Sequence, residues 1–157
     1  MKKKILYIDM DGVIADFEKA IYDLDPHIVL SDEGYRDRVD EVCEENYRLF
    51  RDLNTIAGGI EAVKQLIFSD KYEILFLSSP MWNVPHSFGD KFIWLDRHFG
   101  EFARKRLILS HRKDLNVGDY LIDDTKRNGA GEFTGEHIHI FSDPRFLSWN
   151  DVLNYLL

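Results

Sequence analysis

Ile5-Leu6-Tyr7-Ile8-Asp9-Met10-Asp11-Gly12-Val13 is the stretch that decides the fold. Its first four residues are apolar and have the length and composition of a short buried strand. Two acids, Asp9 and Asp11, follow at once, and Gly12 is a turn former. In open α/β sheets, ligands bind at the carboxyl ends of the parallel strands. The stretch therefore predicts a carboxylate pair at the ligand-binding edge of a sheet, although an ordinary acidic turn has the same local pattern.

Four further apolar runs have the length of strands, at 72–77, 106–109, 120–122 and 137–141. Between them lie residues with helical spacing, after Gly58-Gly59 and again from Phe92 to Phe102. A closing helix is expected from Trp149 to Leu157. Strands that alternate with helices predict βαβ units. The expected fold class is therefore α/β, a Rossmann-like doubly wound parallel sheet.

Residues 15–57 break this alternation because they contain no convincing strand. From Ser31 to Asp52 the segment mixes acids and arginines with apolar residues such as Val39 and Val42. We interpret it as two or three helices that form a small cap after the first strand, although a solvated helical surface has the same composition. The expected division is an α/β core at 1–14 and 58–157, and a small helical cap at 15–57.

The composition limits the classes of partner. A chain of 157 residues that is 45% hydrophobic can bury a full core as one domain. Its net charge of −8 argues against binding a nucleic acid polymer, which needs a basic face. No run approaches the ~20 apolar residues of a membrane span, and the single cysteine, Cys43, forms no internal disulfide. The expected compartment is the cytoplasm, and a homodimer remains an open alternative.

Polar residues also end two other strands of the predicted sheet. Ser78 and Ser79 follow the second strand, and Asp123-Asp124 end the fourth. Because parallel strands point the same way, we expect these residues to lie near Asp9. Carboxylates there can hold Mg²⁺, which prefers oxygen ligands. Asp9 can also attack phosphorus, and Asp11 can transfer a proton.

The order of these motifs resembles the haloacid dehalogenase (HAD) superfamily of phosphotransferases. The resemblance implies that Asp9 is the nucleophile, forming an aspartyl-phosphate, and that Asp11 is the general acid and base. It implies phosphate binding by Ser78 and by Lys113, which lies between the third and fourth strands. The Mg²⁺ ligands implied in this way are Asp9, the backbone carbonyl of Asp11, and Asp124, with Asp123 in support.

A narrower resemblance is to the 5'(3')-deoxyribonucleotidases. It rests on four stretches, at 9–17, 78–80, 91–100 and 119–124. It implies a nucleoside monophosphate as the substrate. It also implies roles for five further residues: Phe17 near the base, Lys91 and Ser79 on the phosphate, and Met81 and His111 beside the nucleoside.

The chain departs from the family pattern in two places. Ser78 stands where Thr is usual, which keeps the hydroxyl group. The cap is short and lacks tryptophan, whereas better-known animal members of the family contact the base with aromatic residues there, so Tyr35, Tyr47 or Phe50 are the candidates for this contact. One alternative is a HAD phosphatase for another small ester, such as a sugar phosphate. A second alternative is a non-catalytic binding protein, against which the presence of both Asp9 and Asp11 argues.

His137 and His139 form a further pattern, because alternation along a strand puts them on one face. Two histidines on one face are compatible with a metal pair. No third ligand with fitting spacing is evident, so we favour strand histidines that are solvent-facing or hydrogen-bonded.

Overall fold

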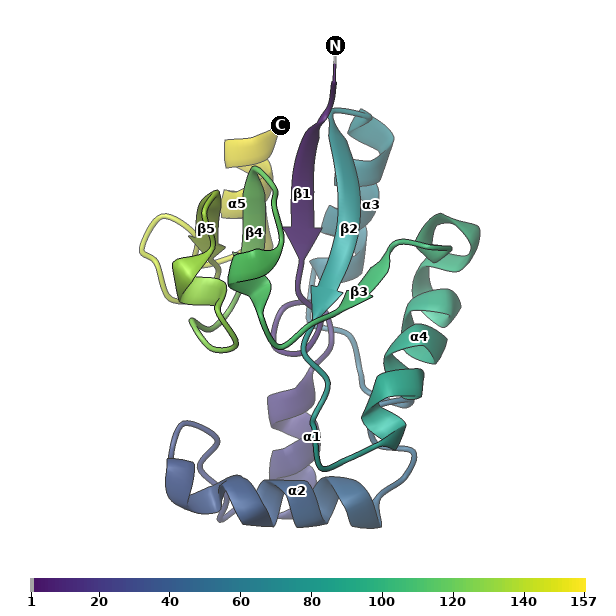
Figure 1. Cartoon of the computed structure of the whole chain (residues 1–157), viewed down its shortest axis with the longest axis vertical. Coiled ribbons are helices and arrows are strands. Elements are labelled where there is room, and N and C mark those ends of the chain that lie inside the picture. The colour runs from purple at the N-terminus through teal and green to yellow at the C-terminus, as the bar shows by residue number, and fades with distance from the viewer. Residues whose placement is uncertain (1) are drawn as a thin grey trace.

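The computed structural model describes residues 2–157 and contains a five-stranded parallel sheet in the order β3-β2-β1-β4-β5 (Figure 1). All neighbouring strands pair in parallel, which confirms the α/β fold class. The strands are β1 (Lys4–Ile8), β2 (Tyr72–Ser78), β3 (Leu107–Leu109), β4 (Tyr120–Asp123) and β5 (Glu136–His139).

Five α-helices accompany the sheet: α1 (Phe17–Leu24), α2 (Arg36–Glu45), α3 (Gly59–Ser69), α4 (His86–Phe99) and α5 (Trp149–Leu156). Four short 3₁₀ helices are η1 (Glu33–Tyr35), η2 (Gly100–Ala103), η3 (Lys113–Leu115) and η4 (Ala130–Glu132). The start of α5 agrees with the sequence, since the Ser148 side chain accepts a hydrogen bond from the Asp151 amide. None of the helices within residues 2–157 has both the length and the apolar character that crossing a bilayer requires.

The chain winds over both faces of the sheet, and the direction of strand order reverses at β1. On one face, Leu6 and Ile8 of β1 share a core with Val63 of α3 and Val152 of α5. On the other face, Tyr7 of β1 packs in a smaller cluster with residues of the η4 segment. Helices α3 and α5 therefore cover one face and the η4 segment covers the other, which makes the sheet doubly wound. The crevice at the reversal point is the usual ligand site of such a sheet.

Residues 15–57, called the cap segment from here on, contain α1, η1 and α2. Both helices lie beyond the carboxyl ends of the strands (Figure 1). The two ends of the segment meet, because the Asp16 amide donates to the Asn54 carbonyl at 2.8 Å and Ala15 forms an antiparallel bridge with Thr55. The segment has the helices that we expected, and its division from the core as a domain stays a prediction.

Helix α4 joins the cap segment to the core. The buried Asp90 carboxylate accepts hydrogen bonds from Arg51 Nε at 3.1 Å and Nη2 at 2.9 Å. One turn further, Trp94 Nε1 donates to the Leu53 carbonyl at 2.9 Å. The helix therefore holds the returning end of the cap segment through buried polar contacts.

Candidate active site

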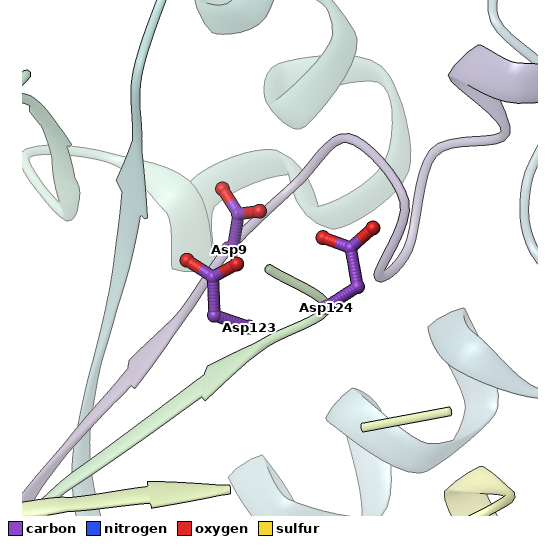
Figure 2. Close-up of side chains that lie close together, drawn as sticks. All are labelled: Asp9, Asp123 and Asp124. Carbon is purple, nitrogen blue, oxygen red and sulfur yellow. The ribbon is translucent and has the colours of Figure 1, made fainter. Parts of the chain in front are cut away.

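Three aspartates meet at the crevice between β1 and β4. Asp9 directly follows β1, Asp123 ends β4, and Asp124 comes next in the chain. Figure 2 shows the three side chains gathered at the ends of these two strands. One carboxylate oxygen from each lies within 4.8 Å of the others. The structure thus brings together acids that the sequence places far apart.

The turn after β1 is shaped by Gly12. The Met10 carbonyl accepts hydrogen bonds from the three amides of residues 13–15, at 3.1, 2.9 and 3.0 Å. Gly12 has a φ of +80°, and a Cβ at this position would lie 2.1 Å from Asp124 Oδ2. Only glycine therefore lets the turn pass so close to the Asp124 carboxylate.

Lys113 is the buried cation of the site. Its Nζ lies 3.0 Å from Asp9 Oδ1 and 2.6 Å from Asp123 Oδ2. Burial by itself would lower the pKa of Lys113, but the charges of Asp9 and Asp123 outweigh burial and raise it. Its own amide donates to the Asn128 carbonyl at 2.8 Å, which fixes the backbone beneath the ammonium group. Lys113 thus lies where the sequence predicted a cation.

Two carboxylates of the site, those of Asp9 and Asp124, are hard to ionise in the absence of a bound cation. Burial raises the pKa of Asp9 to about 8, with the charges of the neighbouring aspartates adding to the effect and Lys113 opposing it. Burial, and then the charge of Asp123, raises the pKa of Asp124 to about 7. A second cation would relieve this repulsion.

The oxygen donors suit a hard divalent cation. Asp9 and Asp124 offer carboxylate oxygens, the ligands that Mg²⁺, Mn²⁺ and Ca²⁺ prefer. Asp123 is more heavily occupied, because Oδ2 accepts from Lys113 and Oδ1 accepts from the Thr125 amide at 2.9 Å. This arrangement agrees with Asp123 as the supporting member of the pair, and the ligand assignment itself stays a prediction.

Asp11 lines the same cavity as Asp9 and is paired with Lys91. Lys91 comes from α4, is almost fully buried, and donates from Nζ to Asp11 Oδ2 at 2.7 Å. We expected Lys91 on the phosphate, whereas its partner here is the predicted acid and base. Its role as a phosphate ligand therefore stays a prediction. Among residues 2–157, no hydrogen-bond donor reaches Asp11 Oδ1.

Ser78 and Ser79 follow one another at the end of β2. The Ser78 carbonyl accepts from the Ser110 amide at 3.0 Å, and Ser79 Oγ donates to the Ser110 carbonyl at 2.6 Å. The two serines thereby connect β2 to the loop that leads to Lys113. Both border the same cavity as Asp9.

That cavity has a volume of about 1070 Å³. Eight of the predicted site residues line it: Asp9, Asp11, Phe17, Ser78, Ser79, Met81, Lys113 and Asp124. The Phe17 ring stacks on the Phe50 ring, with centroids 5.5 Å apart. His111 lies instead in an adjoining groove of about 400 Å³, which Phe17 and the exposed Trp82 also line.

The sequence did not point to several residues of the cavity wall. Leu30, Arg127 and Phe141 line it, from the cap segment, the loop after β4 and the loop after β5. Nothing local marks Leu30, because it reaches the cavity only through the path of the cap segment. The sequence could have indicated Thr125, because the side chain of an aspartate such as Asp123 often accepts a hydrogen bond from the backbone amide two residues later in the chain.

Comparison with known proteins gives a consistent picture. The family model described as "5' nucleotidase, deoxy (Pyrimidine), cytosolic type C protein" matches residues 3–156. A protein of Vibrio phage KVP40 named "Putative 5'(3')-deoxyribonucleotidase" is 42% identical over 154 residues, which cover 98% of this chain and 85% of that protein. The human "5'(3')-deoxyribonucleotidase, cytosolic type" is 32% identical over 177 residues, covering 92% of this chain and 88% of the relative.

Two solved structures share the fold. A hydrolase from Streptococcus pneumoniae TIGR4 has a TM-score of 0.54 at 12% identity, with 98% of this chain and 100% of that chain covered. A haloacid dehalogenase-like hydrolase from Streptococcus pneumoniae has a TM-score of 0.53 at 14% identity, with 98% and 91% covered. At these identities the likeness concerns the fold alone.

Proposed function

This chain belongs to the 5' nucleotidase, deoxy (pyrimidine), cytosolic type C family, and we propose that it is a Mg²⁺-dependent phosphatase of (deoxy)nucleoside monophosphates. One observation carries the proposal. Asp9, Asp124 and the buried ion pair of Lys113 with Asp123 converge at the strand reversal, beside a cavity that Ser78 and Asp11 also line. This set supplies a nucleophile, a proton donor and charge neutralisation for an anionic ester.

The first proposed step is attack by Asp9 on the substrate phosphorus. A carboxylate oxygen of Asp9 forms a bond to phosphorus while the bond from phosphorus to the ester oxygen breaks. Asp11 gives its proton to the departing oxygen, so the product leaves as an alcohol. Lys91 engages only one oxygen of Asp11, which leaves Oδ1 for this transfer.

The second proposed step returns the enzyme to its starting state. Asp11, now a carboxylate, takes a proton from water as the water oxygen attacks phosphorus. The bond between phosphorus and Asp9 breaks, orthophosphate leaves, and the Asp9 carboxylate is restored. One pair of carboxyl groups thereby handles both the covalent intermediate and the proton.

The remaining residues bind and neutralise the phosphate. Ser78 lies at the cavity wall, where its hydroxyl would donate to a phosphoryl oxygen. The Ser79 hydroxyl already donates to the Ser110 carbonyl, so Ser79 would bind the phosphate through its backbone amide. Lys113 offsets charge beside Asp9. A Mg²⁺ ion held by Asp9, Asp124 and the Asp11 carbonyl would neutralise the phosphate further. The acids that would hold it are the same ones whose pKa burial raises.

The nucleoside portion of the substrate has a proposed place as well. The groove that adjoins the main cavity is lined by Phe17, Trp82 and His111. Trp82 and His111 meet edge to face, with ring centroids 5.9 Å apart. Aromatic faces of this kind stack well on nucleobases, which favours a nucleotide over a sugar phosphate. We keep the cytoplasm as the proposed compartment and a homodimer as an open prediction.

A panel of esters tests the proposal. The wild-type protein is assayed for orthophosphate release from deoxynucleoside 5'- and 3'-monophosphates, ribonucleoside monophosphates and glucose 6-phosphate, with MgCl₂ or with EDTA. We expect release with Mg²⁺, none with EDTA, and the highest kcat/KM for a nucleotide. Preference for glucose 6-phosphate would overturn the proposed nucleotide substrate and leave the proposed phosphatase mechanism in force. No release of orthophosphate from any ester would overturn both.

A further inference from the structure

The ladder between β4 and β5 stops abruptly beside the site. The Ile140 amide donates back to the Ile138 carbonyl at 2.9 Å, and the Phe141 amide donates to the Phe146 carbonyl at 2.8 Å. Both amides that follow β5 are thus used within their own segment. The carbonyls at the end of β4 must find donors elsewhere, because a buried carbonyl without a partner is costly.

The two histidines of β5 provide those donors. His139 Nε2 lies 2.9 Å from the Asp124 carbonyl oxygen, and His137 Nε2 lies 3.3 Å from that of Asp123. Since a carbonyl only accepts, each imidazole carries its proton on Nε2 in these contacts. The two rings stack with centroids 5.1 Å apart, so each limits the rotation of the other. These contacts are of the hydrogen-bonded kind that the sequence favoured over a metal pair.

We propose that His139, with His137 stacked on it, is a positioning residue for Asp124. The shorter of the two hydrogen bonds holds the carbonyl oxygen of Asp124, and with it the main chain that carries the carboxylate. On the crevice side, the Asp124 carboxylate lies against the Gly12 turn, where even one methyl group would collide with it. The aspartate is thereby fixed at both its main chain and its side chain. The inference rests on the proposed function only in taking Asp124 as a metal ligand.

Fixing the main chain matters because the charges at this site repel. The Asp124 carboxylate is drawn together with those of Asp9 and Asp123, to within 4.8 Å. In the metal-free protein an unanchored Asp124 would turn away from its neighbours, and cation binding would have to reverse that motion. Groups that orient metal ligands from outside typically change metal affinity by about 10- to 100-fold when removed.

The test compares two variants of similar length, His139→Gln and His139→Met. Gln keeps an N–H donor near the position of Nε2, and Met has none. Metal-free protein is titrated with MgCl₂ in a calorimeter, which reads binding without any substrate. We expect His139→Met to raise the Mg²⁺ Kd about tenfold, and His139→Gln to stay within about threefold of wild type. His98→Met is the matched control, because His98 packs against Trp94 in α4, with the rings tilted by 45°, and its loss should leave the Kd unchanged.

Equal Mg²⁺ affinity in His139→Met and wild type would overturn the proposal. Loss of the folded state in both His139 variants, read by circular dichroism, would also overturn it, because His139 would then serve the fold alone. The outcome is separate from that of the phosphatase assay. A wild-type protein that binds Mg²⁺ but releases no phosphate would refute the proposed function and leave the comparison of His139 variants in force.

Discussion

The edge of the sheet that carries Asp9, Asp123 and Lys113 buries its charged side chains, whereas the cap segment exposes charged side chains of the same types. At the edge, Lys113 and Asp123 pair at 2.6 Å with almost no exposure to solvent. In the cap segment, Arg48 and Asp52 pair at 2.8 Å with about half of each side chain exposed. Removing water strengthens electrostatic interactions and raises the cost of an unpaired charge. The buried set is therefore suited to chemistry, and the exposed set mainly keeps the surface soluble.

Asp9→Asn should have the largest effect of any change at the edge. Asn keeps the shape of the side chain but cannot attack phosphorus, so we expect kcat to fall by on the order of 10⁴- to 10⁶-fold. The fold should persist, because the substitution removes an acid that burial already disfavours in its charged form. Phosphate release and near-UV circular dichroism measure the two outcomes. A variant with undiminished turnover would show that Asp9 is not the nucleophile.

Lys113→Met should have the next largest effect, this time on stability. It leaves the buried Asp9 and Asp123 without their cation, which typically costs about 3–5 kcal/mol. Urea denaturation measures the free energy of unfolding. Lys64→Met, at an exposed position of α3, is the matched control and should change stability by less than about 0.5 kcal/mol. Equal stability in the two variants would contradict the contrast between edge and surface.

The pH dependence of Mg²⁺ binding gives a third, smaller effect. The pKa of Asp124 is raised to about 7 and that of Asp9 to about 8, so at pH 6 both acids hold protons that Mg²⁺ must displace. The Mg²⁺ affinity should therefore rise at least about tenfold from pH 6 to pH 8. Without metal, raised carboxyl pKa values make the fold lose stability as pH rises from the unfolded values, near 4, toward 8.

Thermal melts check this sign directly. The gain in Tm on adding MgCl₂ should be larger at pH 8 than at pH 6. Asp124→Asn removes one of the titrating ligands and should flatten the difference. A Tm gain that is the same at both pH values in the wild-type protein would speak against proton displacement at this site.

Arg48→Ala should have the smallest effect. The pair with Asp52 is exposed and lies four residues apart along the chain, and such pairs contribute about 0.2–1 kcal/mol. Urea denaturation should show a loss within that range that shrinks at high salt, with kcat unchanged. A loss comparable to that of Lys113→Met would remove the distinction between the two regions.

The sequence predicted the parts of this molecule that depend on local pattern. Apolar runs located the five strands within residues 2–157, and the polar residues that end three of the runs pointed to Asp9, Ser78 and the pair Asp123-Asp124. These predictions succeed because a buried parallel strand is apolar along its length and the ends of such strands meet at one edge. The other strand boundaries agree with the apolar runs to within one residue, and the largest difference is at β5. This strand ends at His139, although the apolar alternation continues to Phe141, because the next amide turns back to Ile138.

The rest depended on contacts between distant segments. Nothing near Lys91 in the chain indicates that it meets Asp11, since this contact depends on how α4 packs against the turn after β1. Leu30 reaches the cavity through the fold of the cap segment, and His139 reaches Asp124 only because β5 lies beside β4. Side-chain partners of this kind follow from tertiary geometry, which hydrophobic periodicity does not encode.

The closed base of residues 15–57 bears on how such a protein can diversify. The amide of Asp16 and the carbonyl of Asn54 are bonded at 2.8 Å, so the chain leaves and re-enters the core at nearly one point. Whatever lies between these two residues can change in length or sequence while the spacing of its attachment points stays the same. The segment between Asp16 and Asn54 can therefore be replaced, in evolution or by design, to change the substrate while the register of every strand pair in the sheet stays the same.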